Sequence, residues 1–174
     1  MKASDPLSVA NAGLVLLNPF LPHFFAQLGV LTDDGKGKPH FADNKALSRA
    51  VHLLQYLVDE RCDRPAHELV LNKVLCGATA SIPIAAAIVP SEEERALCTA
   101  LLGAVLANWR ILRDASPASL RETFLQREGR LTHNAKGWAL NVQRKTIDIL
   151  VDQIPWTFAI LYPRWFDEAL YVTW

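Results

Sequence analysis

The chain has 174 residues, and its 51% hydrophobic and 21% charged residues are close to the globular average, which excludes a disordered or fibrous protein. Lysine plus arginine equal aspartate plus glutamate at 18 each, so the net charge is zero and the electrostatic footprint of a nucleic-acid-binding protein is missing. The three cysteines form no CxxC pair, which favours reduced thiols in a cytosolic protein over a disulfide framework.

The first apolar segment, residues 9–31, has the length of a membrane span but is interrupted by polar residues and prolines. The interrupting residues are Asn18, Pro19, Pro22, His23 and Gln27. Polar groups at these depths would be costly in hydrocarbon, so we expect a buried or partner-facing helix over 11–30 and no stable membrane insertion. We expect this helix to bend at the prolines and to end at Gly29. The polar residues 1–6 precede no cleavage site, so we expect no secretory signal.

Loop and helix signals alternate in the next part of the chain. The aspartates and glycines of residues 32–39 predict an exposed loop. Asp43 is a good N-cap for a helix whose apolar residues recur at helical spacing: Leu47, Val51, Leu54 and Val58. A short helix is predicted over 68–76, with Gly77 as its natural stop.

The clearest helix signal lies in the middle of the chain. An S-x-x-E capping box at residues 91–94 opens a helix that runs to about Arg110, and its wide apolar arc indicates a central helix or one that contacts a partner. Before it, residues 78–90 are apolar but broken by prolines, which predicts an irregular segment packed on the body. After it, a Ser-Pro pair at 116–117 starts a short helix over 118–126.

The hydrophobic period changes to two in the last part of the chain. Residues 130–133 and 138–143 alternate around a turn, which predicts a β-hairpin. Helical spacing returns over 147–154, alternation resumes over 156–160, and 170–174 are predicted to form a last strand.

Together these elements predict an α+β fold. It consists of a mainly helical body of about five to six helices and a small antiparallel β-sheet in the C-terminal third. We expect a single domain over 1–174, with a helical part at 8–128 and a β-rich part at 129–174 that share one core. No internal repeat, low-complexity tract or long linker divides the sequence.

Motifs with a defined catalytic mechanism are missing. The sequence has no G-x-S-x-G elbow, no HExxH, no Walker loop and no G-x-G-x-x-G. Asp33 and Asp34 lack the spaced ligand series of a calcium loop. A zinc site would need at least three ligands to converge from one scattered set: Cys62, His67, Cys76 and Cys98. We therefore expect no enzymatic activity, no cofactor and no metal.

Apolar segments broken by prolines suit packing against other chains, and eight residues are candidates for a partner interface. They are Leu14, Leu17, Phe20, Phe24 and Phe25 in the first helix, and Leu71, Lys73 and Val74 in the helix over 68–76. Four of the five tryptophans lie from Trp138 onward. Because large aromatics fill a small sheet packed on helices, we expect Trp138, Trp156 and Trp174 to lock the terminal sheet onto the body, with a ligand platform as the alternative.

Several sequence blocks occur in a recognisable order. They are Asn11–Leu17 with Pro19–Leu21, Arg49–Leu57, Glu68–Gly77, Leu120–Arg127 with Gly129–Leu131, Pro155-Trp156 and Leu170–Trp174. In this order they resemble the conserved C-terminal region of the tape-measure proteins of contractile injection systems, the phage-tail-like particles of bacteria. The resemblance covers about residues 9–174. It departs from the family pattern at Pro163-Arg164-Trp165, which stands where a second Pro-Trp pair is expected.

The resemblance implies a structural role and brings no catalytic residues. A protein of this family lies inside the inner tube, engages the baseplate hub and helps to set tube length. The implied partners are baseplate hub, spike and inner tube proteins, with this chain as a homo-oligomer in the particle and no nucleic acid. The implied location is the cytoplasm during assembly and the inside of the particle afterwards.

The length of the chain limits the ruler role. Even a continuous helix of 174 residues would span only about 260 Å at 1.5 Å per residue, and prolines and glycines divide this chain into short elements. We therefore expect either the terminal docking module of a longer tape measure or a short member that only docks. A chaperone or adaptor for particle assembly and a cargo effector carried by the particle are the alternatives.

Overall fold

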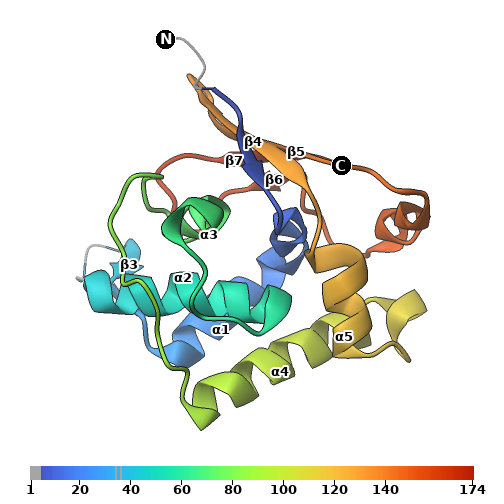
Figure 1. Cartoon of the computed structure of the whole chain (residues 1–174), viewed down its shortest axis with the longest axis horizontal. Helices are drawn as coiled ribbons and strands as arrows, with labels where there is room; N and C mark the ends of the chain where they lie inside the picture. The colour runs from blue at the N-terminus through green and yellow to red at the C-terminus, as the bar shows by residue number, and fades with distance from the viewer. Residues whose placement is uncertain (1–4, 34, 36) are drawn as a thin grey trace.

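Five strands form a sheet along one side of a helical body, and two short strands form a second, smaller sheet (Figure 1). The computed structural model describes residues 5–33, 35 and 37–174. The polar N-terminal stretch 1–4 and Asp34 of the predicted loop lie outside these described residues. Within them, no helix combines the length and hydrophobicity that crossing a bilayer requires.

Helices and strands are both present in number, which confirms the α+β class. The α-helices are α1 Leu21–Leu28, α2 Asn44–Asp59, α3 Val70–Leu75, α4 Glu92–Asn108 and α5 Pro117–Leu120. The 3-10 helices are η1 Ala12–Phe20, η2 Ala66–Glu68, η3 Arg110–Leu112, η5 Thr146–Ile149 and η6 Val151–Gln153, and η4 Arg121–Leu125 is a π-helical turn. The strands are β1 Leu7–Val9, β2 Leu31–Asp33, β3 Pro39–Phe41, β4 Gly129–Asn134, β5 Gly137–Val142, β6 Ile160–Leu161 and β7 Leu170–Thr173.

The two longest helices begin at the capping residues that the sequence predicts. Oδ1 of Asp43 accepts a hydrogen bond from the backbone N–H of Ala46 at 2.7 Å, at the start of α2. At α4, Oγ of Ser91 accepts from the N–H of Glu94 at 3.1 Å, and Oε1 of Glu94 accepts from the N–H of Ser91 at 2.8 Å. This reciprocal pair is the predicted capping box, and it is confirmed.

The segment predicted as one bent helix is a 3-10 helix, η1, followed directly by α1. A 3-10 helix bonds each carbonyl to the N–H three residues later, and Pro19 has no N–H to offer the carbonyl of Leu16. The indole Nε1 of Trp156 donates to the carbonyl of Leu16 at 2.9 Å and supplies this bond from elsewhere in the chain. The helical segment ends as predicted at Gly29, whose φ of 68° is left-handed.

η1 lies in the centre of the core. Its residues from Ala12 to Leu17 are all buried. A Cβ at Gly13 would lie 1.9 Å from the carbonyl oxygen of Phe124, so only glycine permits this close packing of η1 on η4. Trp109 of α4 is also fully buried, and its Nε1 donates to the carbonyl of Leu150 at 3.0 Å. The core therefore joins the helical body to the segment that follows the hairpin.

The main sheet has the strand order β1-β4-β5-β7-β6. Its centre is the predicted hairpin of β4 and β5, paired from Gly129 with Val142 to Asn134 with Gly137. Two details differ from the predicted antiparallel sheet of the C-terminal third. β1 joins it from the start of the chain, and β7 runs parallel to β5, so the sheet is mixed. The crossover that a parallel neighbour requires is the segment 143–169, which contains η5 and η6.

The loop predicted over residues 32–39 contains part of a short hairpin. β2 and β3 pair from Leu31 with Phe41 to Asp33 with Pro39. The ring of Phe41 packs edge-on against Phe25, with centroids 5.4 Å apart, and this contact anchors the hairpin to the core.

The predicted strand over 156–160 is shorter than expected. β6 contains Ile160 and Leu161, which pair with β7, and the N–H of Val172 donates to the carbonyl of Ala159 at 2.8 Å. The alternation of Trp156 and Phe158 reflects aromatic packing instead, because their rings contact those of Phe20 and Trp174 with centroids 5.2 and 5.9 Å apart.

Candidate functional site

The interface candidates of the first helix are placed in the interior by the structure. Four of them are at most 2% exposed: Leu14, Leu17, Phe24 and Phe25. Phe20 is half-buried against Trp156. Since the four buried side chains contact the core of their own chain, a partner could reach them only if η1 or α1 left the body.

The candidates in α3 are buried as well. Leu71 and Val74 lie in the core, and Lys73 is only 4% exposed. Nζ of Lys73 donates to the carbonyl of Ala80 at 3.3 Å, and burial lowers the pKa of this ammonium below its ordinary value. Lys73 thus holds the irregular segment after α3 against the helix.

Two of the three tryptophans predicted to lock the sheet, Trp156 and Trp174, bond to helical segments. Nε1 of Trp156 reaches η1, as described above, and Nε1 of Trp174 donates to Oδ2 of Asp148 at 2.8 Å. Trp138 is half-buried and packs on His133, with ring centroids 4.6 Å apart. Trp165, which was not among the predicted residues, is more deeply buried and donates to the carbonyl of Leu75 at 2.9 Å.

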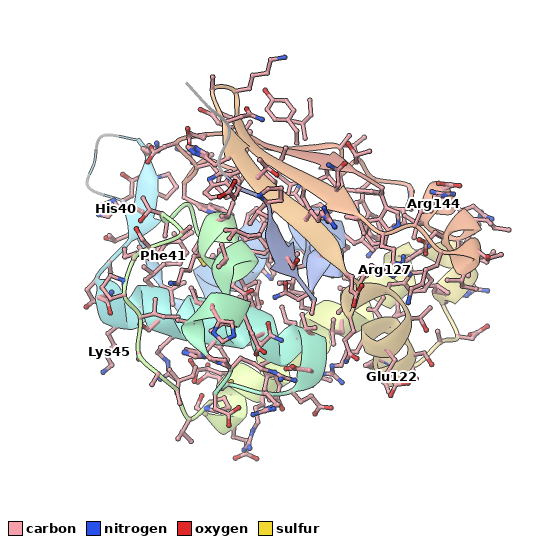
Figure 2. The ribbon with its side chains drawn as sticks, turned by 45° about the horizontal axis from the view of Figure 1, so that its top comes forward. His40, Phe41, Lys45, Glu122, Arg127 and Arg144 are labelled. Carbon is pink, nitrogen blue, oxygen red and sulfur yellow. The ribbon has the colours of Figure 1, made fainter. Side chains whose placement is uncertain are left out.

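A buried ion pair between Arg127 and Asp148 joins the helical body to the terminal segments, and neither side chain is exposed. Figure 2 labels Arg127, which lies where the turn after α5 meets the main sheet. Nη2 of Arg127 donates to Oδ1 of Asp148 at 2.8 Å, and Nη1 donates to Oδ2. The guanidinium also donates to the carbonyls of Thr123 and Gln143 and lies 5.4 Å from the ring centroid of Trp174. Arg127 therefore contacts η4, the end of β5, η5 and the last residue of the sequence.

Asp148 has a shifted pKa for two opposing reasons. Burial raises the pKa of the carboxyl, but the hydrogen bonds from Arg127, from the backbone N–H of Lys145 and from Trp174 outweigh it. The pKa of Asp148 is consequently below its ordinary value. No motif in the sequence pointed to this pair, since Arg127 and Asp148 are 21 positions apart.

The possible zinc ligands do not come together. Among the described residues there is no group of three or more His, Cys, Asp or Glu side chains that could hold a metal ion. Burial raises the pKa of Cys62 to about 11 and that of Cys98 to about 12, and it raises the pKa of Cys76 still further. These thiols are protonated at neutral pH and pack as small apolar groups.

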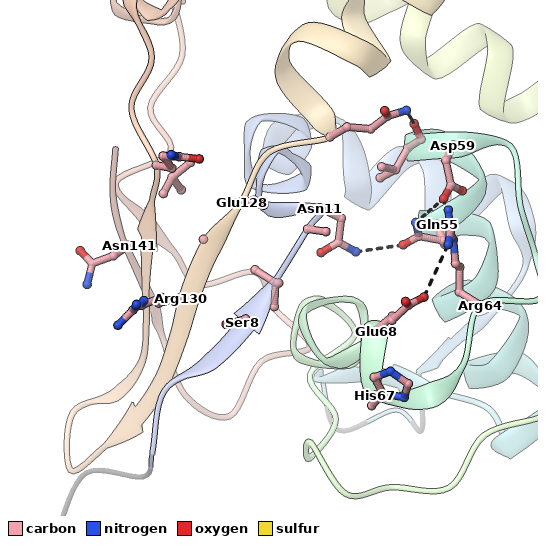
Figure 3. Close-up of a pocket in the computed structure, with 17 residues that line it drawn as sticks. Ser8, Asn11, Gln55, Asp59, Arg64, His67, Glu68, Glu128, Arg130 and Asn141 are labelled. Atoms are coloured by element: carbon pink, nitrogen blue, oxygen red, sulfur yellow. Dashed lines mark hydrogen bonds and ion pairs between the residues drawn. The ribbon is translucent and has the colours of Figure 1, made fainter.

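A groove of about 860 Å³ lies between β1, at the edge of the main sheet, and the C-terminal end of α2 (Figure 3). Residues 8–10 form one wall, and η2 with the end of α2 forms the other. The side chains of Arg130 and Asn141 point away from Asn11, toward the opposite side of the sheet (Figure 3). The groove was not predicted, because the three-residue strand that forms it gives no periodic signal.

Side chains that are linked by hydrogen bonds line the closed end of the groove. Nδ2 of Asn11 donates to Oε1 of Gln55 at 2.9 Å and to Oδ1 of Asn72 at 2.7 Å. Nε2 of Gln55 donates to Asp59 at 3.0 Å, and Nε of Arg64 donates to the same carboxylate oxygen at 2.9 Å. Asn11, Gln55 and Asn72 are all buried, so the apolar core contains a polar cluster that opens toward the groove.

The outer face of the main sheet carries a row of side chains across four strands. Cross-strand pairing aligns Thr132, Ala139, Tyr171 and Ile160. Ile160 is 58% exposed and Tyr171 is 41% exposed, although both are large and apolar. On the opposite face, Leu131 and Leu140 pair and are buried against the body. The outer face therefore presents these two apolar side chains beside a polar row of Arg130, Asn141 and Thr173, which are all exposed.

Comparison with known proteins identifies the family. The family model described as contractile injection system tape measure protein matches residues 2–174. No curated protein and no solved structure matches the chain. Because the family match extends over essentially the whole sequence, as the ordered sequence blocks implied, the chain belongs to the contractile injection system tape measure family.

Proposed function

We propose that this chain is a structural assembly module, the terminal region of a tape-measure protein, that docks onto hub, baseplate or inner tube proteins of the particle. The family match over residues 2–174 carries the proposal. The arrangement of short elements around one core supports a docking role over a ruler role. Among the residues that the structure describes, no helix is longer than the 17 residues of α4.

The docking surface in this proposal is the outer face of the main sheet, because the helices first predicted to dock are buried. Ile160 and Tyr171 are neighbours there, and large apolar side chains that gather on an exposed face mark interaction sites. In this proposal the chain has no catalytic role, and residues 1–174 form a single domain. The chain is made in the cytoplasm and ends as several copies inside the particle.

Co-expression with the hub, baseplate and tube proteins tests the proposal. We expect the chain to co-purify with at least one of them and to be present in purified particles. Tyr171→Glu should reduce the association, whereas Thr99→Glu on the exposed surface of α4 is the matched control. Failure to associate under every co-expression condition would refute docking. Binding to a particle protein together with absence from finished particles would instead indicate an assembly chaperone or adaptor.

A cargo effector gives a different result in the same system. It would be present in purified particles, but its deletion would leave particle yield and tube length unchanged in electron micrographs. For a tape-measure module we expect deletion to reduce the yield of particles or to change their length.

A further inference from the structure

The edge of the main sheet at β1 has free backbone groups. The N–H of Gln143 donates to the carbonyl of Glu128, so this facing pair of the β4–β5 ladder is hydrogen-bonded, and the bonded pairs recur every second residue along β4. The residues between them, Gly129 and Leu131, therefore direct their N–H and C=O toward β1.

This alternation fixes the direction of the groups in β1. Gly129 and Leu131 face Val9 and Leu7, so these two residues bond to β4, and Ser8 between them directs its N–H and C=O away from the sheet. Among the residues that the structure describes, no strand pairs with this outer edge of β1. Ser8 is exposed and lines the groove, so its backbone donor and acceptor face a space that another strand can enter.

The groove is lined by three carboxylates and two arginines, Arg64 and Arg130, and the side chain of Arg130 points away from Asn11 (Figure 3). Asp59, Glu68 and Glu128 line it, and the C-terminal end of α2 adds the negative pole of a helix. Arg64 is held by Asp59, and its Nη1 lies 3.7 Å from Glu68. Glu128 is exposed and makes no ion pair with any described residue.

Asn11, at the closed end, has a carbonyl oxygen that its own network leaves unpaired. Nε2 of Gln55 donates to a carboxylate and Nδ2 of Asn72 donates to the carbonyl of Val51, and both of these partners can only accept. Gln55 and Asn72 must therefore turn their oxygens toward Asn11, and Nδ2 of Asn11 donates to both oxygens. As a result Oδ1 of Asn11 is buried without a hydrogen-bond partner, in a side chain that lines the groove and is only 2% exposed.

We propose that an extended segment of another particle protein pairs with the free edge of β1 at Ser8 and places a lysine or arginine side chain in the groove, toward Glu68, Glu128 and Asn11. This inference rests on the proposed docking function and specifies the chemistry of one partner. Backbone bonds at a sheet edge recognise any extended chain, and the pocket beside the edge selects the side chain. The acceptor-rich lining selects a cationic donor over an acidic or purely apolar side chain.

Substitutions at Ser8 separate strand addition from folding. Ser8→Pro removes the outward N–H but none of the bonds to β4, and edge strands tolerate proline at such positions. Ser8→Ala keeps the N–H and is the matched control. We expect Ser8→Pro to weaken association with the particle partner by about fivefold or more, the equivalent of one lost hydrogen bond, and Ser8→Ala to bind like the wild type.

Charge reversal tests the cation. Glu68→Lys should weaken association by about tenfold, and reversal of one basic residue in the partner segment should restore it. Glu68 is exposed, so we expect Glu68→Lys to fold like the wild type. This variant therefore tests the groove even if Ser8→Pro does not fold. Unchanged melting temperatures of the isolated variants establish that the fold is intact.

A photo-crosslinking amino acid at His67, exposed on the groove wall, identifies the partner segment in assembled particles, with Thr99 on α4 as the control position. A cross-link from His67 to an extended segment containing lysine or arginine, lost in Ser8→Pro and kept in Ser8→Ala, supports the proposal. If the chain is in the particle but His67 cross-links no more than Thr99, or only to an acidic or helical segment, the groove proposal is overturned and docking stands. If the chain binds no particle protein at all, docking itself is overturned.

Discussion

Removal of the Arg127 cation should destabilise the chain strongly, because Asp148 would be left buried without its counter-ion. Arg127→Met keeps much of the side-chain length and removes the charge. Asp148 would retain hydrogen bonds only from Lys145 and Trp174, and the carbonyls of Thr123 and Gln143 would lose their donor. Breaking a buried pair in this way costs about 3–5 kcal/mol of unfolding free energy.

Urea unfolding followed by tryptophan fluorescence measures this loss. With a slope of about 2 kcal/mol per molar, the midpoint should fall by about 2 M. The variant in which Arg127→Met is combined with Asp148→Leu should recover a large part of the loss, since no unpaired charge remains. A midpoint shift below about 0.5 M in Arg127→Met would refute the reasoning, because such a small cost means that water reaches the carboxylate.

The same pair makes the stability depend on pH. The pKa of Asp148 is lower in the folded chain than its ordinary value, so the unfolded chain binds the proton more readily. The contribution of this carboxylate is therefore complete above the ordinary aspartate pKa of about 4 and is lost as the pH falls through the lowered value. In Asp148→Asn the unfolding free energy should fall less steeply in this acid range, and an unchanged pH dependence would contradict the assignment.

Three further substitutions test the packing and the docking surface. Gly13→Ala should cost about 3 kcal/mol or more, because its Cβ meets the backbone oxygen of Phe124, and an unchanged urea midpoint would contradict the packing of η1 on η4. Trp156→Phe should cost about 1–3 kcal/mol through the carbonyl of Leu16 that loses its donor, measured as the same midpoint. Tyr171→Glu should change stability by less than about 1 kcal/mol while it reduces co-purification with particle proteins, so a strong drop in melting temperature would argue that this side chain is structural.

Local chemistry explains why much of the helical body could be predicted. The capping residues at α2 and α4 and the left-handed glycine after α1 act through neighbours only a few positions away. The hairpin of β4 and β5 is equally local. These elements therefore appear in the sequence as complete signals.

The remaining features depend on partners far away in the sequence. β1 has only three residues, and it is a strand because it pairs with β4. The parallel pairing of β7 with β5 likewise has no local signature. The apolar residues of η1 are buried inside this chain, but periodicity alone could not distinguish burial in the core from burial against a partner. For this reason the predicted interface residues are interior ones, and the groove at β1 was missed.

The position of β7 between β5 and β6 has a kinetic consequence. The sheet unites Leu7–Val9 with residues near 130 and Leu170–Thr173 with residues near 140, and such distant pairings form slowly compared with helices built from local contacts. The outer row that includes Tyr171 exists only after this last strand has inserted. The surface that we propose for docking is thus absent until β7 has paired with β5 and β6, so a partner can recognise it only after the sheet has formed.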